Sequence, residues 1–518
     1  MQLPLQPLVE QGAEFLRRRR DPRDDLRRLR GGSGSKTDHG DENMAVHWHA
    51  LRVPCRTRLE KPPMPKPTIL TALTRRSFLQ STAAASAWFV APRILGNVLG
   101  ANDRLNLGVI GTGGMGTAHL RGLTERRERD NVQVIRVCDL YRRRLNQAAQ
   151  IIGGGEGSGT MEYREVLDDP EVDAVVIATP DHWHTKIAIE AMEAGKDVYC
   201  EKPLSLTVEQ AIECRDAVRR TGRVLQVGPQ RTSDDRFWKA RDAIAAGRIG
   251  PVTWSQASYC RNSHDGQFNW HIDPDAGPAN TPDAEGYVWW DRWLGWEWDL
   301  APRIDWNADH FFRFRKYFAY NGGVATDLLY HLLAPLLLSI SGPDGEYPAR
   351  VVASGGLYIE KDERDIPDTF MMTVDYPTQH TVQLISVMTN DVGVPTVIHG
   401  QRGTLSLGER RIDIQEQAAW WKEFRQTNAG LFPYRMETND KGERVPEPPP
   451  GKASFSVHNS PRRDHMGNFL DSVRGDDVPN CNVELGASTM VAIKMGVEAY
   501  RQSKTLLWDA DSERVVAS

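Results

Sequence analysis

The sequence predicts an α/β protein with a Rossmann domain, that is, a doubly wound parallel sheet, followed by an α+β domain with a large, mostly antiparallel open sheet. Three observations support this prediction. A short apolar strand at 105–110 leads into a glycine-rich loop and a helix, further apolar strands alternate with helices up to about residue 227, and short runs beyond Gly342 alternate apolar and polar residues.

The composition is that of an ordinary globular protein, with 518 residues, 40% hydrophobic residues, 26% charged residues and a formal charge of −5. It excludes collagen-like, coiled-coil, disulfide-scaffold and multi-span membrane classes. Residues 1–63 carry 13 Lys/Arg and 9 Asp/Glu, so this basic leader contrasts with an acidic remainder. Because Asp21, Asp24 and Asp25 interrupt the basic leader and no binding module follows, we expect no nucleic-acid partner.

Residues 74–80 match a twin-arginine export signal at Arg75 and Arg76. The uncharged stretch 77–92 is shorter than the ~20 residues of a transmembrane helix and is rich in Ala and Ser. An Ala-rich N-terminal helix of the fold is the alternative. We expect a periplasmic or otherwise exported protein that uses the twin-arginine export machinery, with cleavage after Ala101 or a membrane tether if the signal is retained.

Signal peptides stand at N-termini, so we expect Met64 to be the natural start. The predicted domains are a leader with signal peptide at 1–101, a Rossmann dinucleotide-binding domain at 102–228 and a substrate-binding and oligomerisation domain at 229–518.

The glycine-rich loop has the pattern G-x-G-x-x-G between a strand and a helix, which is the context of a dinucleotide-binding fingerprint. Gly111 permits the tight turn, Gly113 lets the backbone approach a pyrophosphate, and Gly116 allows close packing of helix and strand. The phosphates then lie at the positive end of the helix. The predicted cofactor-binding residues of this loop are Gly111, Gly113, Gly114, Met115 and Gly116.

A second apolar strand, 132–137, is followed by Asp139, which lies at the distance from the loop expected for a ribose-binding acid. A carboxylate there accepts hydrogen bonds from both ribose hydroxyls and repels a 2′-phosphate, so NAD is favoured. The adjacent Arg142, Arg143 and Arg144 leave NADP open.

Two further strands end in polar clusters. The run 173–178 is followed by Thr179-Pro180-Asp181-His182-Trp183-His184 and a helix at 185–194, and the strand 197–200 is followed by Glu201-Lys202-Pro203. Ligands of doubly wound sheets bind at the carboxyl ends of the strands, where both clusters lie.

The order of G-x-G-x-x-G, T-P-x-x-x-H and E-K-P resembles the Gfo/Idh/MocA family, the glucose–fructose oxidoreductase and inositol dehydrogenase group, from about Leu105 to the C-terminus. The resemblance implies that Lys202 is catalytic. It also implies a homo-oligomer, either a dimer or a tetramer. The cofactor contacts that it implies are Thr179, Pro180, His184, Glu201 and Lys202.

A third polar pair follows a glycine turn at Gly322-Gly323, which leads into an apolar helix. Asp327 and His331 are spaced i, i+4 and therefore share one face of that helix. The stretch is similar to the family's G-G-x-x-x-D-x-x-x-H, which implies that His331 exchanges the proton of the reacting oxygen and that Asp327 orients the substrate. A core histidine or a zinc pair are alternatives, but we expect no metal.

Weaker candidates for substrate contacts are Gln230, Arg261 and Asn262. Six tryptophans between 287 and 306 suit either a carbohydrate site or core packing. The expected strands of the second domain are 369–376, 381–387 and 397–407, and 485–501 is an expected helix. The six cysteines show no metal spacing, and we expect no disulfide framework.

These residues predict an NAD(P)-dependent oxidoreductase that acts on a secondary hydroxyl of a sugar, cyclitol or glycoside. Lys202, buried beside the positive cofactor ring, would have a lowered pKa and exchange a proton near neutral pH. Outside the cytoplasm no cofactor pool exists, so we expect tightly bound, internally recycled cofactor. The alternatives are a redox-neutral glycoside hydrolase that works by transient oxidation and elimination, and a non-catalytic sugar-binding protein.

Overall fold

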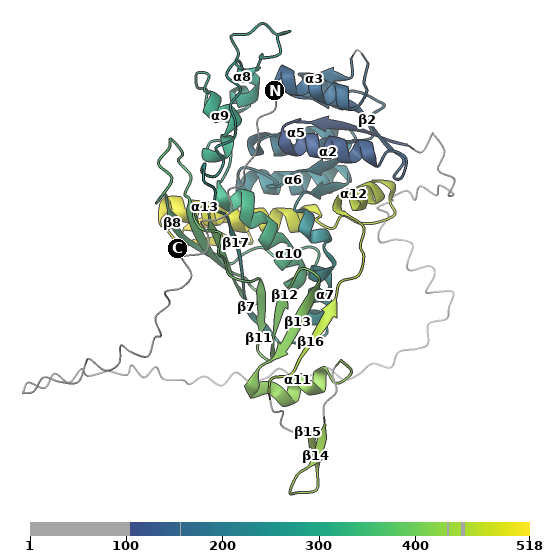
Figure 1. The fold of residues 1–518 in the computed structure, drawn as a ribbon, viewed down its shortest axis with the longest axis vertical. Coiled ribbons are helices and arrows are strands. Elements are labelled where there is room, and N and C mark those ends of the chain that lie inside the picture. Colours follow the sequence, from purple (N-terminus) through teal and green to yellow (C-terminus); the bar gives the residue numbers. More distant parts are fainter. Residues whose placement is uncertain (1–103, 156, 432–434, 447–450, 518) are drawn as a thin grey trace, which may run out of the picture. The chain divides into compact units, whose positions relative to one another are not determined.

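The computed structural model of the chain describes residues 104–155, 157–431, 435–446 and 451–517. These residues form two large sheets that are connected by helices, and a separate two-stranded hairpin (Figure 1). The twin-arginine segment, the Met64 start and Cys55 lie outside the described residues.

Within the described part, the first sheet has six parallel strands, and this confirms the predicted Rossmann topology. Its strands, in spatial order, are β3 (Gly159–Thr160), β2 (Val132–Cys138), β1 (Leu105–Ile110), β4 (Ala174–Ile177), β5 (Asp197–Cys200) and β6 (Leu225–Val227). The four residues of β4 and of β5 are all buried, as expected for strands covered on both faces.

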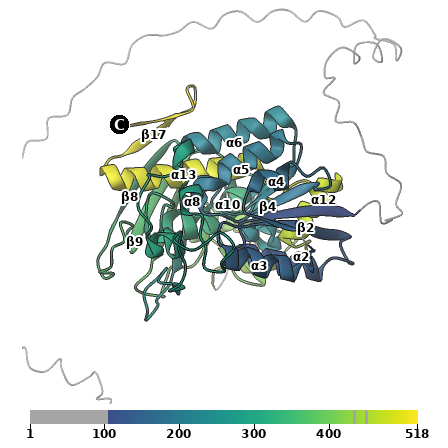
Figure 2. The ribbon, with the colours of Figure 1, turned by 90° about the horizontal axis from the view of Figure 1, so that it is seen from above.

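Helices cover both faces of this sheet, with α2 and α3 on one side and α5 and α6 on the other (Figure 2). The helix α6 is well delimited by its sequence, since Thr207 and Gln210 form a capping box and Gly222 ends it in the left-handed conformation. The helices of this domain are α2 (Gly114–Glu125), α3 (Arg142–Ile151), α4 (Tyr163–Leu167), α5 (Asp181–Glu193) and α6 (Val208–Thr221).

The second sheet has ten strands within the described part and is antiparallel except where β7 and β10 run parallel. This confirms the predicted large open sheet. Its strands, in spatial order, are β16 (Ser454–His458), β13 (Arg411–Glu416), β12 (Gly403–Leu407), β11 (Val397–Gly400), β7 (Val252–Cys260), β10 (Thr381–Val387), β9 (Thr369–Asp375), β8 (Arg350–Gly356), β17 (Leu506–Asp509) and β18 (Arg514–Ala517).

The longer helices of the second half pack against its sheet or return to the first domain. Helix α12 joins the Rossmann core through Met466, Phe469 and Leu470. A separate hairpin, β14 (Met436–Thr438) with β15 (Arg444–Pro446), projects away from the sheet (Figure 1). The helices are α7 (Asp235–Ala245), α8 (Trp290–Leu294), α9 (Ala308–Phe312), α10 (Tyr330–Ile340), α11 (Trp421–Thr427), α12 (His465–Arg474) and α13 (Val483–Gln502), with short 3₁₀ turns at η2 (Gln230–Ser233), η3 (Trp296–Trp298), η4 (Phe314–Lys316) and η6 (Ala418–Trp420) and a π-helix at η5 (Ala325–Leu329).

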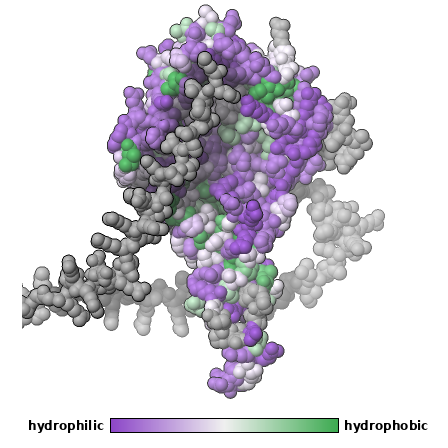
Figure 3. Space-filling model, viewed as in Figure 1, coloured by the Kyte–Doolittle hydropathy of each residue, from purple (hydrophilic) through white to green (hydrophobic). Residues whose placement is uncertain are grey.

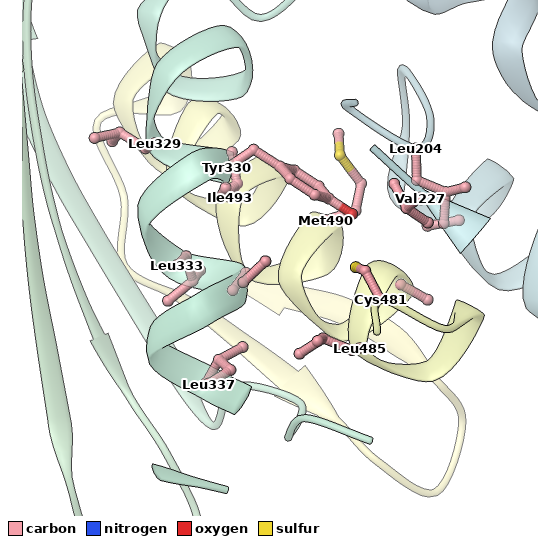
Figure 4. Packing of buried hydrophobic residues seen from close by; sticks show 14 of the residues in the cluster. Leu204, Val227, Leu329, Tyr330, Leu333, Leu337, Cys481, Leu485, Met490 and Ile493 are labelled. Carbon is pink, nitrogen blue, oxygen red and sulfur yellow. The ribbon is translucent and has the colours of Figure 1, made fainter. Parts of the chain in front are cut away.

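The core that joins the two sheets lies between α10, α13 and β6 (Figure 4). Leu333 and Leu337 of α10 face α13, and Tyr330 reaches toward Val227 of β6. The buried hydroxyl of Tyr330 donates a 2.7 Å hydrogen bond to the carbonyl of Gly486, which satisfies its polar atom within the apolar core.

The predicted element bounds needed three corrections. The helix expected at 185–194 begins four residues earlier, with Pro180 as its N-cap. The expected strand 397–407 is two strands, because the backbone of the turn at 401–403 bonds to the carbonyls of Ile249 and Pro251 instead of continuing the ladder. The segment after Gly323 is a π-helix before it becomes α-helical.

The tryptophan-rich segment mainly forms a core. Trp290 and Trp293 are buried and stacked with ring centroids 4.9 Å apart, in a cluster that includes Phe311 and Tyr320. The five described cysteines are free thiols. Among the described residues, no helix is long and apolar enough to cross a membrane. The face seen in Figure 3 carries mostly hydrophilic residues with scattered hydrophobic patches.

We expect Leu333→Ala to lower the free energy of unfolding by about 2–5 kcal/mol, because it empties a fully buried site between α10 and α13. Denaturant or thermal unfolding measures the change. Leu431→Ala is the matched control, since Leu431 is 43% exposed and its loss should change stability by less than about 0.5 kcal/mol. Equal effects of both substitutions would contradict the assigned core.

Candidate active site

The glycine-rich loop has the geometry that a dinucleotide requires. Gly111 has φ +85°, and a Cβ on Gly116 would lie 1.8 Å from the carbonyl oxygen of Gly111, so neither position tolerates a side chain. A Cβ on Gly113 would meet only Arg144, at 3.7 Å. Because α2 begins at Gly114, the loop presents a helix N-terminus with space beside Gly113 for a phosphate group.

Asp139 stands at the end of β2 and holds this loop. Its Oδ2 accepts hydrogen bonds from the backbone N–H (2.7 Å) and the hydroxyl (3.1 Å) of Thr112, and its Oδ1 accepts from the N–H of Tyr141 (2.9 Å). A carboxylate has about four acceptor positions, so one remains on Oδ1 for a ribose hydroxyl. The predicted ribose role of Asp139 therefore fits the structure, and the sequence did not reveal that it also positions the loop.

The three arginines after Asp139 differ in what they contact. Arg142 donates to the carbonyl of Pro282, and Arg143 pairs with Asp275. Arg144 lines the cavity described below, and its guanidinium lies 5.3–5.5 Å from the ring centroids of Tyr141, Phe311 and Phe312. Of the three, only Arg144 is placed to meet a cofactor.

The T-P cluster lies at the end of β4. Thr179 and Pro180 line the cavity, and the buried hydroxyl of Thr179 has no hydrogen-bond partner within the described part of the chain. His184 is buried on α5 behind them, with its ring nitrogens 2.7 and 2.8 Å from the carbonyl oxygens of Pro203 and Thr179. It connects the two loops that border the cavity, and it does not line the cavity itself.

Glu201 is held by three donors. Its Oε1 accepts from His119 Nε2 (2.7 Å) and Gln230 Nε2 (2.9 Å), and its Oε2 accepts from the backbone N–H of Lys202 (3.1 Å). Burial opposes ionisation, but the hydrogen bond and charge of His119 and the charge of Lys202 lower the pKa of Glu201 to about 2. Glu201 is therefore an anion with its own fixed partners.

Lys202 and Asp327 form a buried ion pair between the two domains. Lys202 Nζ donates to Asp327 Oδ1 (2.7 Å) and to its backbone carbonyl (3.1 Å), and Arg315 Nε donates to the same Oδ1 (2.9 Å). Burial would raise the pKa of Asp327, but the charges of Lys202 and Arg315 outweigh it and hold that pKa well below its usual range. One carboxylate thus positions two cations.

His331 follows one turn later, and its ring nitrogens make no hydrogen bond to a described residue. Burial, and after it the charge of Lys202, lower the pKa of His331 to about 4, so its imidazole is neutral at pH 7. Its ring lies edge-on to Tyr259, with centroids 6.3 Å apart. The π-helical turn at Ala325–Leu329 precedes it, and such turns are frequent at functional sites.

A buried hydrogen bond fixes this turn to the first domain. Asn321 Nδ2 donates to Asp181 Oδ2 (2.6 Å) at the start of α5, and Asn321 Oδ1 accepts from the N–H of Gly323 (2.6 Å). Burial raises the pKa of Asp181 to about 7. The glycine turn that leads to Asp327 is therefore anchored to the same helix that follows the T-P cluster.

The glycine loop, the T-P cluster and the three predicted catalytic residues border one cavity of about 630 Å³, a size typical of small-molecule and cofactor sites. Its wall contains Gly111, Gly113, Gly114, Met115, Asp139, Thr179, Pro180, Glu201, Lys202, Gln230, Arg261, Asp327 and His331. The predicted cofactor loop and the three predicted catalytic residues are thus brought together.

Other predicted residues lie elsewhere. Gly116 is buried under the loop, and His184 is behind the wall. Asn262 is exposed on the strand end, where it forms an isolated bridge with Thr389, and it does not border the cavity. Within the described part of the chain, no group of acidic, Cys and His side chains has the arrangement of a metal site.

Sequence reasoning missed Arg315, His119 and Asn321. Arg315 lies in η4, beyond the tryptophan-rich segment, and His119 lies on α2 and meets Glu201 only through the tertiary fold. Of these three residues, only Asn321 could have been found from the local sequence, since it directly precedes the paired glycines of the predicted turn.

Comparisons with known proteins agree with this geometry. Residues 105–229 match the family described as "Oxidoreductase family, NAD-binding Rossmann fold" (GFO_IDH_MocA). Inositol 2-dehydrogenase 2 of Saccharopolyspora erythraea is 38% identical over 147 residues, which are 28% of this chain and 42% of that protein. The scyllo-inositol 2-dehydrogenase (NAD(+)) of Bacillus subtilis is 35% identical over 142 residues, which are 27% and 40%. The match spans less than half of the length of these relatives.

Solved structures share the fold over both domains. An NAD-binding protein from Listeria innocua aligns with a TM-score of 0.53 at 23% identity, over 78% of this chain and 99% of its own. The WlbA dehydrogenase from Bordetella pertussis, solved with NADH and UDP-GlcNAcA, aligns with a TM-score of 0.52 at 16% identity, over 79% and 100%.

We expect Gly116→Ala to abolish or strongly weaken NAD binding, because the added Cβ would lie 1.8 Å from the backbone of Gly111 and displace the loop. Calorimetric titration with NAD measures this loss. Gly122→Ala is the control on the same helix, since its Cβ would meet nothing within 4 Å and alanine favours helix by about 1 kcal/mol. Unchanged NAD affinity in Gly116→Ala would show that the loop does not bind the dinucleotide.

Proposed function

We propose that the chain, which matches the Gfo/Idh/MocA oxidoreductase family over residues 105–229, is an NAD-dependent dehydrogenase that oxidises a secondary hydroxyl of a sugar or cyclitol. One observation carries this proposal. Lys202, Asp327 and His331 border the same cavity as a glycine loop shaped for a dinucleotide.

The residues of the wall fit the dinucleotide. The glycine loop and the N-terminus of α2 would hold the pyrophosphate, and Asp139 would hold the adenosine ribose. The hydroxyl of Thr179, which has no partner among the described residues, would supply a further hydrogen bond. When bound, the nicotinamide supplies the hydride acceptor. Because Asp139 repels a 2′-phosphate, we assign NAD ahead of NADP.

The protein groups divide the work on the reacting hydroxyl. Neutral His331 accepts the hydroxyl proton, and the cations Lys202 and Arg315 stabilise the negative charge that develops on the oxygen. Asp327 keeps both cations in place. The proton exchange expected of Lys202 stays a prediction.

We extend the proposal to location and cofactor handling. The twin-arginine motif at Arg75 and Arg76 supports export by a route that carries folded proteins. An exported dehydrogenase would keep its cofactor bound and regenerate it within the site, and a dimer or tetramer is the expected assembly. The relatives described above are named as dehydrogenases, which gives no support to a glycoside hydrolase or a non-catalytic sugar-binding protein.

Lys202→Ala should lower turnover about 10²–10⁴-fold, the range of one acid–base or electrostatic group, while NAD binding persists. The assay follows NADH formation across a panel of cyclitols and sugars. A second measurement tests whether the protein retains its cofactor: the protein is purified without added cofactor and denatured, and the released nicotinamide is quantified. Lys504→Ala, an exposed residue after α13, is the control. Near-normal turnover of Lys202→Ala would overturn the catalytic assignment, and a protein without affinity for NAD would overturn the function.

The pH profile should show the lowered pKa of His331. Its imidazole must be neutral to accept a proton, so kcat/KM for oxidation should remain constant through pH 6.5 and fall only as the pH approaches about 4. In His331→Asn this acidic limb should disappear together with most of the activity. Circular dichroism in the same buffers shows whether the fall in kcat/KM at acidic pH is caused by unfolding of the protein. A half-maximal rate near pH 6.5 would contradict the buried, neutral base.

A further inference from the structure

The three acidic residues of the cavity wall already have hydrogen-bond donors from the protein. Asp139 accepts from Thr112 and Tyr141, and Glu201 accepts from His119 and Gln230. Asp327 accepts from Lys202 and Arg315. These hydrogen bonds hold the three carboxylates in place, and none of the three carboxylates forms an ion pair with Arg261.

The cations of the wall are more numerous. Arg292 pairs with Glu162, and Lys202 shares Asp327 with Arg315. Arg144 and Arg261 have no carboxylate within 4.0 Å in the described part of the chain. Arg144 lies beside Gly113 and so belongs to the dinucleotide end. Arg261 remains as an unpaired cation at the other end.

Contacts place Arg261 next to the catalytic residues. Its Nη2 donates a 2.8 Å hydrogen bond to the hydroxyl of Tyr259, and the ring of Tyr259 packs edge-on against His331. Arg315, which shares Asp327 with Lys202, lies over the ring of Trp270 at the cavity wall.

Resting on the proposed dehydrogenase function, we propose that Arg261 is a specificity-determining residue that binds an anionic group of the substrate. The substrate class is thus a sugar acid or a sugar phosphate whose oxidised hydroxyl meets His331. A guanidinium binds a carboxylate or a phosphate through two parallel hydrogen bonds, and a partly buried cation without a partner gains most from such a ligand.

Matched pairs of ligands test this proposal on the NAD-loaded protein. Calorimetry compares D-glucuronate with D-glucose, D-galacturonate with D-galactose, and D-glucose 6-phosphate with D-glucose. We expect an anionic member to bind about tenfold or more tightly than its neutral partner, with an advantage that shrinks at high salt. Preference for the uronates or for the phosphate then identifies the source of the anion.

Variants assign the effect to the arginine. Arg261→Gln should remove the advantage of the anionic ligand and leave the affinity of the neutral partner unchanged, and Arg261→Lys should restore part of it. Arg121→Gln, an exposed cation on α2, should change neither. Three outcomes would overturn the anion site. The two members of every pair bind equally well, none of the ligands binds, or Arg261→Gln lowers the affinity of both members of a pair equally.

The two proposals fail in different ways. Reduction of NAD by neutral sugars without any preference for acids overturns the anion site and leaves the dehydrogenase intact. Absence of NAD binding overturns the dehydrogenase, and the ligand pairs then report on Arg261 in the protein without cofactor.

Discussion

The buried ion pair between Lys202 and Asp327 is the interaction on which the site depends. Lys202 follows β5 of the first sheet, and Asp327 lies in the π-helical turn before α10 of the second domain. A buried carboxylate is costly unless cations and hydrogen bonds surround it, so both domains must hold their partners in place. Removal of Asp327 would leave Lys202 and Arg315 without their shared carboxylate, whereas removal of Lys202 would leave Asp327 with Arg315 as its ion-pair partner.

Rigid neighbours hold this pair in position. Asn321 joins the glycine turn to Asp181, His184 spans the loops after β4 and β5, and Glu201 is fixed by His119. Behind them, α10 and α13 pack against β6, so the second domain cannot shift without opening the core (Figure 4). Most of these polar contacts serve geometry, while His331 keeps its ring nitrogens available for a ligand.

The neutral state of His331 shows how the surroundings of a side chain decide its chemical role. In water a histidine is partly protonated near neutral pH, but burial and the nearby ammonium of Lys202 favour the neutral ring. The same fold therefore places a neutral acceptor beside a cation pair. The neutral state of His331 does not follow from its residue type alone, because an exposed histidine with the same neighbours in sequence would keep a pKa closer to the ordinary value.

The sequence by itself determined the Rossmann order, the glycine loop, Asp139 and the three catalytic candidates, because these depend on periodicity, on the backbone freedom of glycine and on motifs within a few residues. It did not find the π-helical turn, and the predicted substrate contact of Asn262 stays a prediction, because Asn262 does not border the cavity. Only the tertiary structure decided that His119 meets Glu201 across 82 residues, that Asp181 meets Asn321 across 140, and that Arg315 shares Asp327. Such contacts depend on how distant elements pack, and local sequence carries no record of that packing.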